Sequence, residues 1–90
     1  MITYTIPEDI IVTELDNNEA ILLDMRNKRY YSLNETGLAI FRGIEASLSQ
    51  DKIVESIMSA YEVDQEKANN SVNSIIQKLL SLNIVEKHET

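Results

Sequence analysis

The 90-residue chain has no cysteine and no tryptophan, and only one histidine, one proline and two glycines. Without cysteine there is no disulfide, no thiolate nucleophile and no cysteine-ligated metal, which fits a cytoplasmic protein. The single histidine, His88, lies near the C-terminus, in a segment that we expect to be a frayed tail. A serine–histidine pair would depend on that tail, and a metal site would need carboxylates alone. The sequence therefore predicts neither an enzyme nor a cofactor.

Basic residues are also scarce, since eight lysines and arginines stand against 15 acidic residues and the net charge is −7. Such a surface repels nucleic-acid phosphates and anionic lipid. No purely apolar run exceeds four residues, and the N-terminus lacks the pattern of a signal peptide. We expect no nucleic-acid partner and no membrane partner.

Four carboxylates lie near the ends of predicted strands or in turns: Glu14, Asp16, Glu19 and Asp24. Paired carboxylates can do acid–base chemistry when burial separates their pKa values. Nothing in the sequence around these four indicates burial, so we assign them to solubility.

The length supports one domain, which we place at residues 10–86. Residues 1–9 are expected to form a tail or an edge segment, and residues 87–90 a C-terminal tail. Three segments of high β-propensity, at 10–15, 19–24 and 28–33, are separated by short turn clusters. This spacing predicts an antiparallel meander, which must cover one face to be stable.

Three helices are expected after the meander, the first at about residues 35–46. The second runs from Ser49 to about residue 61, and the third from Asp64 to about residue 82. Asn34, Ser49 and Asp64 are suitable N-caps, and Asn83 suits a left-handed position after the last helix. The pattern predicts an α+β, winged-helix-like fold, with an N-terminal three-stranded antiparallel sheet followed by three helices.

The third helix has two apolar faces. At about 100° per residue one narrow stripe contains Ala68, Val72, Ile75, Leu79 and Leu82, which is enough to dock the helix on a core. Ile76 and Leu80 lie to one side, in line with Asn69 and Asn73. That flank is either a wider core face or the wall of a peptide groove, because amides can bond a peptide backbone. If it is a groove wall, Ile76→Asp is expected to weaken peptide binding and to leave the fold intact.

Positive charge gathers at Arg26, Lys28 and Arg29, around the second turn and the start of the third strand. These residues either form a solvated hairpin tip or steer an acidic peptide along a sheet edge. The third strand is tethered directly to the first helix, so its edge can face a helix across a gap that admits one extended peptide.

A winged-helix fold also suggests a DNA-binding protein, in which the third helix would contact the base edges. That helix carries Lys67 and Lys78 against Asp64 and Glu66, and it has no arginine. It therefore offers few donors for base edges and little charge for phosphates, so a DNA-binding regulator is the weaker alternative.

Residues 21–24, 29–37 and 40–41 together resemble the PqqD-like family, which is named after the D protein of pyrroloquinoline quinone biosynthesis. Its members include the recognition elements of ribosomally made, modified peptides. The similarity extends over roughly residues 10–86, and the Tyr-Tyr-x-Leu-Asn-x-Thr-Gly run is its most specific part. Phe41 stands where many members have tryptophan, Asn83 stands where glycine is usual, and a glycine is missing at 46–48.

The resemblance implies non-catalytic binding of the leader region of a precursor peptide, as a strand added beside strand three and packed on the third helix. The implied peptide-binding residues are Lys28, Arg29, Tyr30, Tyr31, Ser32, Leu33, Asn69, Val72, Asn73, Ile76 and Leu80. The protein would deliver the peptide to a leader peptidase in a lasso-peptide pathway, which we favour. The alternative is a radical S-adenosylmethionine enzyme, with this chain as the peptide chaperone of the quinone pathway. A homodimer, through the sheet face or a swapped N-terminal segment, is left open.

Overall fold

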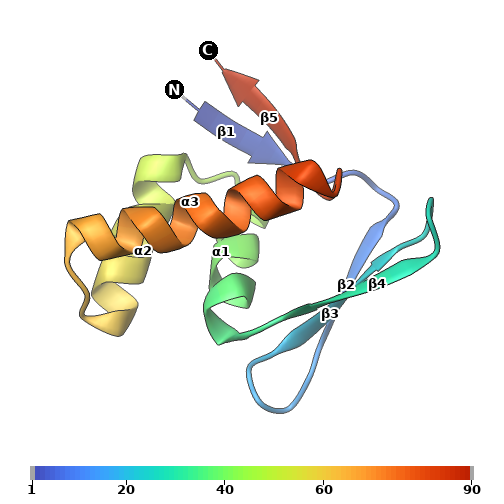
Figure 1. The fold of residues 1–90 in the computed structure, drawn as a ribbon, viewed down its shortest axis with the longest axis horizontal. Helices are drawn as coiled ribbons and strands as arrows, with labels where there is room; N and C mark the ends of the chain where they lie inside the picture. The colour runs from blue at the N-terminus through green and yellow to red at the C-terminus, as the bar shows by residue number, and fades with distance from the viewer. Residues whose placement is uncertain (1, 90) are drawn as a thin grey trace.

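The computed structural model describes residues 2–89, and Figure 1 shows their arrangement. Two groups of strands flank three helices. In chain order the elements are β1 (Ile2–Thr5), β2 (Ile10–Glu14), β3 (Ala20–Asp24), β4 (Arg29–Leu33), α1 (Glu35–Glu45), α2 (Gln50–Tyr61), α3 (Gln65–Ser81) and β5 (Glu86–Glu89). The predicted α+β, winged-helix-like fold is confirmed, and each predicted strand of the meander agrees with its observed strand to within one residue at either end.

The strands β2, β3 and β4 form an antiparallel sheet in that order, so β4 is an edge strand. Alternation along the strands turns Ile10, Ala20, Leu22 and Leu33 toward the helices, and these residues are buried. The sheet projects to one side of the helical body (Figure 1).

Local capping determines where each helix begins. The Asn34 side chain accepts a hydrogen bond from the Gly37 N–H at 2.8 Å, and Ser49 and Asp64 cap α2 and α3 in the same way. A Cβ on Gly37 would lie 3.2 Å from Asn34 Oδ1 and from Leu33 Cδ2, so this position favours glycine by its close contacts. The three predicted caps are confirmed, and Asn83 has the expected left-handed backbone, with φ 60°.

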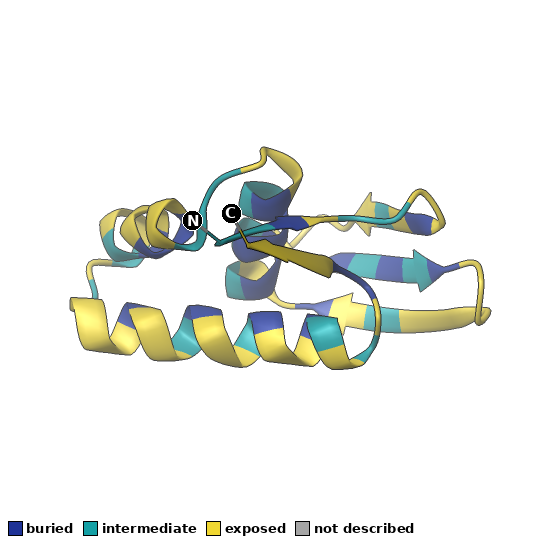
Figure 2. Cartoon of the chain, turned by 90° about the horizontal axis from the view of Figure 1, so that it is seen from above, coloured by how far each residue is buried: buried dark blue, intermediate teal, exposed yellow. Residues whose placement is uncertain are grey.

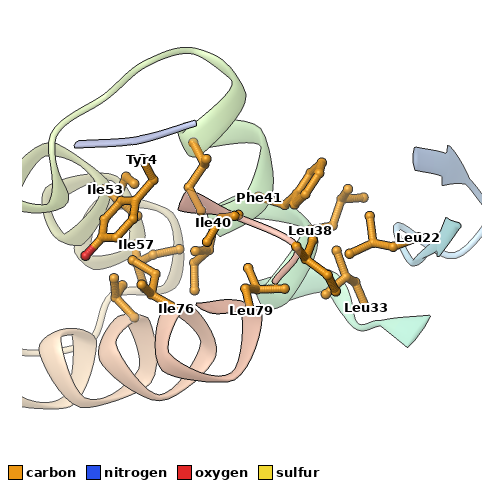
Figure 3. Close-up of a cluster of buried hydrophobic side chains, with 14 of the residues drawn as sticks. Tyr4, Leu22, Leu33, Leu38, Ile40, Phe41, Ile53, Ile57, Ile76 and Leu79 are labelled. Atoms are coloured by element: carbon orange, nitrogen blue, oxygen red, sulfur yellow. The ribbon is translucent and has the colours of Figure 1, made fainter. Parts of the chain in front are cut away.

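The core lies where the sheet and the three helices meet, around Phe41 and Ile40 (Figure 3). From α3 it receives the buried residues Ala68, Val72, Ile76 and Leu79, which form the dark stripe along the helix in Figure 2. The predicted core stripe is therefore wrong in part. The helix is turned so that Ile76 replaces Ile75 and Leu82, which are only partly buried.

The chain ends also depart from the prediction. Residues Glu86–Glu89 pair with β1 as an antiparallel ribbon, with Ile2 opposite Glu89 and Thr3 opposite His88. The ribbon is held by the buried Tyr4 ring, whose hydroxyl donates to Gln50 Oε1 at 2.7 Å. The expected frayed tail is thus wrong for residues 87–89, whereas residues 1 and 90 lie outside the described part.

Candidate functional site

The pattern of hydrogen-bonded residue pairs between β2 and β3 determines which backbone groups of β3 face β4. The N–H of Leu15 donates to the Glu19 carbonyl at 2.7 Å, and the N–H of Met25 donates to the Asp9 carbonyl at 3.0 Å. Hydrogen-bonded pairs alternate along an antiparallel ladder. The odd-numbered residues of β3 therefore bond to β2, and its even-numbered residues face β4.

The same alternation identifies the free groups of β4. Its residues Arg29, Tyr31 and Leu33 stand opposite even-numbered residues of β3 and turn their backbone groups toward that strand. The N–H and C=O groups of Tyr30 and Ser32 consequently point away from the sheet, along its open edge. An edge of this kind is a template for one more strand.

A groove of about 370 Å³ separates this part of β4 from α3. Most of its wall is apolar, with Glu19 and Lys78 as the charged members. The full lining is Glu19, Tyr31, Ser32, Leu33, Asn34, Gly37, Ile75, Lys78, Leu79, Leu82 and Ile84. The groove can therefore take apolar side chains from a strand whose backbone pairs with β4.

The apolar groove continues into a more polar hollow toward the middle of α3. The two share Asn34 and Ile75, and the hollow adds Thr36, Asn70, Ser71 and Ser74. A ligand longer than one strand would thus meet hydroxyl and amide groups beyond the apolar part.

The strand side of the predicted site largely borders this groove. Tyr31, Ser32 and Leu33 line it directly. Lys28 and Arg29 are exposed at the turn before β4, and the Tyr30 side chain, 72% exposed, lies on the opposite face of the sheet. That these six residues contact a peptide stays a prediction.

The helix side of the predicted site is not in the groove. Val72 and Ile76 are completely buried, so a bound peptide could not reach them in this fold. Asn69, Asn73 and Leu80 line neither the apolar groove nor the polar hollow, and Asn73 instead accepts a hydrogen bond from Gln50 at the start of α2. The α3 residues that line the groove are Ile75, Lys78, Leu79 and Leu82. That Asn69, Asn73 and Leu80 contact a peptide stays a prediction.

One of the four carboxylates assigned to solubility is buried. Asp24 has no exposed surface, and its Oδ1 accepts from the backbone N–H groups of Arg26 at 3.0 Å and of Asn27 at 3.3 Å. Its Oδ2 accepts from the Asn27 side-chain amide at 2.9 Å, and Arg26 Nε lies 3.4 Å from Oδ1. The assignment to solubility is therefore wrong for Asp24, which organises the turn before β4.

Asp24→Asn is expected to destabilise the domain in a pH-dependent way. The hydrogen bond from the Asn27 amide, followed by those from the two backbone N–H groups and Arg26, holds the pKa of Asp24 below its ordinary value of 3.8, although burial opposes this. The charged carboxylate therefore stabilises the fold above pH 3.8, and this contribution disappears as the pH falls through the lower folded-state pKa.

Thermal melts at pH 7 and at pH values stepped downward from 3.8 would check this expectation. The melting temperature of Asp24→Asn should lie several degrees below that of the parent chain at pH 7, and the gap should close in acid. A gap that is independent of pH would show that the charge of Asp24 does not matter.

Residues 2–89 contain no group of three or more histidine, cysteine, aspartate and glutamate side chains that could hold a metal ion. No helix in the same range is long and apolar enough to cross a membrane.

Comparisons with known proteins agree with this fold. A family model described as coenzyme PQQ synthesis protein D (PqqD) matches residues 19–85. The solved structure of TbiB1 in complex with the TbiA(beta) leader peptide is 22% identical, with a TM-score of 0.84 over 91% of this chain and 94% of that one. A lasso peptide synthetase B1 complexed with the leader peptide is 23% identical, with a TM-score of 0.83 over 92% and 96%. No curated protein matches the chain by sequence.

Proposed function

The chain belongs to the PqqD family, and we propose that it binds the leader region of a ribosomally synthesised precursor peptide as a strand added to β4. The observation that carries this proposal is the open edge of β4 beside an apolar groove. Main-chain hydrogen bonds to Tyr30 and Ser32 would supply affinity that depends little on the peptide sequence. Side-chain pockets would supply selectivity.

The groove favours one mode of binding. A strand beside β4 turns every second side chain toward the helices, because side chains alternate along a strand. Ile75, Leu79 and Leu82 on α3 then form the surface against which those side chains pack. The peptide would be ordered on the protein without any covalent chemistry.

Binding without chemistry suits a delivery role. A peptide held by its leader keeps its remaining part at a high effective concentration near a partner enzyme. The two structural relatives are a TbiB1 and a lasso peptide synthetase B1, both in complex with leader peptides. They support a lasso-type pathway with a leader peptidase as partner, over the quinone pathway with its radical S-adenosylmethionine enzyme. The lack of cysteine fits the cytoplasmic location that this role implies.

Calorimetric titration tests the proposal directly. The probe is a synthetic leader peptide from a short precursor, to be sought among the genes that neighbour the gene of this protein, and a scrambled leader of the same composition is the control. We expect saturable binding of the leader alone. Amide NMR signals of Tyr30 and Ser32 should shift on binding, and those of β2 should not. Binding of duplex DNA in place of the leader would contradict the proposal.

Ile75→Asp is expected to reduce leader affinity at least tenfold, since a buried contact at the centre of an interface commonly contributes that much. The residue lines the groove and is only partly buried, so a carboxylate there would be desolvated by the peptide and not by the fold. Calorimetry measures the affinity, and circular dichroism checks that the helix content is retained.

Gln77→Asp is the matched control for Ile75→Asp. It introduces the same charge two residues later on the same helix, at an exposed position that does not line the groove. Equal losses of affinity in the two variants would mean that charge repulsion alone, and not the groove, explains the result.

A further inference from the structure

Few polar side chains join the sheet to the helical body. In the described chain, two side-chain polar contacts link residues 10–33 to the residues that follow them. One joins Glu14 Oε2 to Arg42 at 2.9 Å, and the other joins Arg26 Nη2 to the Asn83 carbonyl at 2.5 Å. The first involves β2, which forms the opposite edge of the sheet from β4 and the groove. The second lies at the turn that leads into β4.

Both groups that the Arg26 side chain contacts are held in place by the fold. On the sheet side, Arg26 is anchored by Asp24, which is buried and whose Oδ1 also accepts from the backbone N–H groups of Arg26 and Asn27. On the helix side, the acceptor belongs to Asn83, whose left-handed backbone ends the α3 segment. Ile84, which follows directly, is buried and lines the groove. The Arg26 side chain thus connects the turn before β4 to the segment that follows α3.

The two ends of β4 are held differently. At its Leu33 end the strand passes through Asn34 directly into α1, so this end is fixed by the covalent chain. At its Arg29 end the strand leaves the β3–β4 turn, which the Arg26 contact holds to the end of α3. Without that contact the turn would still be tied to Asp9 through the Met25 N–H, but no side-chain polar contact would hold it to the end of α3, and the groove could widen from this end.

We propose that Arg26 is a positioning residue, which sets the spacing between β4 and α3 by bridging Asp24 and the Asn83 carbonyl, and thereby sets the affinity for a peptide in the groove. The affinity part rests on the function proposed above, whereas the spacing part does not. Arginine suits this role because its Nε and Nη2 are separate donors in one planar group. Lysine keeps the charge but has a single donor nitrogen.

The spacing can be measured without any ligand. Because the chain has no cysteine, Met25→Cys and Gln77→Cys give two unique sites for spin labels, one in the β3–β4 turn and one on α3. Both side chains are exposed and neither lines the groove. Electron–electron double resonance should give a narrow distance distribution in the otherwise unchanged protein. The distribution should broaden toward longer distances with Arg26→Gln and with Arg26→Lys.

Two variants serve as controls. Asn27→Ala removes a hydrogen bond donated to the same carboxylate but does not touch α3, and Glu14→Gln removes the charge from the other polar link, on β2. Both should keep the narrow distribution even where the melting temperature falls. A distribution that is unchanged in Arg26→Gln, or that broadens equally in Asn27→Ala, would overturn the spacing role.

Calorimetry with the synthetic leader then tests the affinity part. Arg26→Gln and Arg26→Lys should each weaken binding about three- to tenfold, as expected if the binding-competent spacing becomes a minor population. Asn27→Ala and Glu14→Gln should bind as the parent does. Parent-like affinity in Arg26→Lys would overturn the affinity part and would identify charge as the cause of any loss in Arg26→Gln. If the parent chain itself binds no leader, the proposed function is wrong, and the distance measurement still decides the role of Arg26.

Discussion

Ile76→Asp is expected to unfold the domain. Ile76 has no exposed surface and lies between Val72 and Leu79 on the buried stripe of α3, near Ile57 in Figure 3. Removing a buried isoleucine side chain costs about 2–5 kcal/mol, and a buried carboxylate adds a desolvation penalty. Since small domains are stable by about 5–15 kcal/mol in total, the variant should lose its cooperative melt, as measured by circular dichroism against temperature and urea.

This expectation replaces the one drawn from the sequence, in which the same change weakens binding and spares the fold. Gln77→Asp, one residue further along α3 and exposed, should melt close to the parent. A folded Ile76→Asp variant that melts like Gln77→Asp would mean that α3 is turned about its axis relative to the structure described above.

Ser32→Pro is expected to abolish most leader binding while the domain stays folded. The Ser32 N–H points to the open edge of β4, so its loss removes no bond within the sheet. An incoming strand would lose a donor and would meet the proline ring at the centre of the edge. We expect at least a tenfold loss of affinity, from a missing hydrogen bond of about 0.5–1.5 kcal/mol together with the steric clash.

Tyr31→Pro makes the matched comparison one residue earlier. The Tyr31 backbone faces Leu22 of β3, so proline there removes a bond of the ladder and should lower the melting temperature markedly. If instead Ser32→Pro destabilises the fold and Tyr31→Pro does not, then the backbone groups of Ser32, and not those of Tyr31, face β3, contrary to the assignment above. If both are folded and both bind the leader, the peptide does not pair with this edge.

Features that depend on neighbouring residues could be predicted well from the sequence. The Asn34, Ser49 and Asp64 caps and the turns of the meander follow from side chains that bond to the backbone a few positions away. The position of β4 along the groove was predictable for the same reason, because β4 leads directly into α1.

Features that depend on distant segments could not be predicted in the same way. The apolar arc of α3 is wide enough that Ile75 or Ile76 can face the core, and the choice depends on how the helix packs on α1 and α2. The polar β5 segment gave no local sign of a strand, since it is ordered by β1 at the other end of the chain. The burial of Asp24 depends on hydrogen bonds from Arg26 and Asn27. The backbone conformation of this turn directs both of their N–H groups toward the carboxylate.

The β1–β5 ribbon has a consequence for how such a domain can be joined to other proteins. Because Ile2 stands opposite Glu89, the two ends of the described residues lie side by side, as Figure 1 shows. The groove is lined by β4 and α3, and no residue of the ribbon takes part in it. A partner sequence could therefore be fused at either end, or the whole domain could be inserted into a surface loop of an enzyme, with the groove left open. A short linker between the two ends would likewise allow circular permutation without altering the groove.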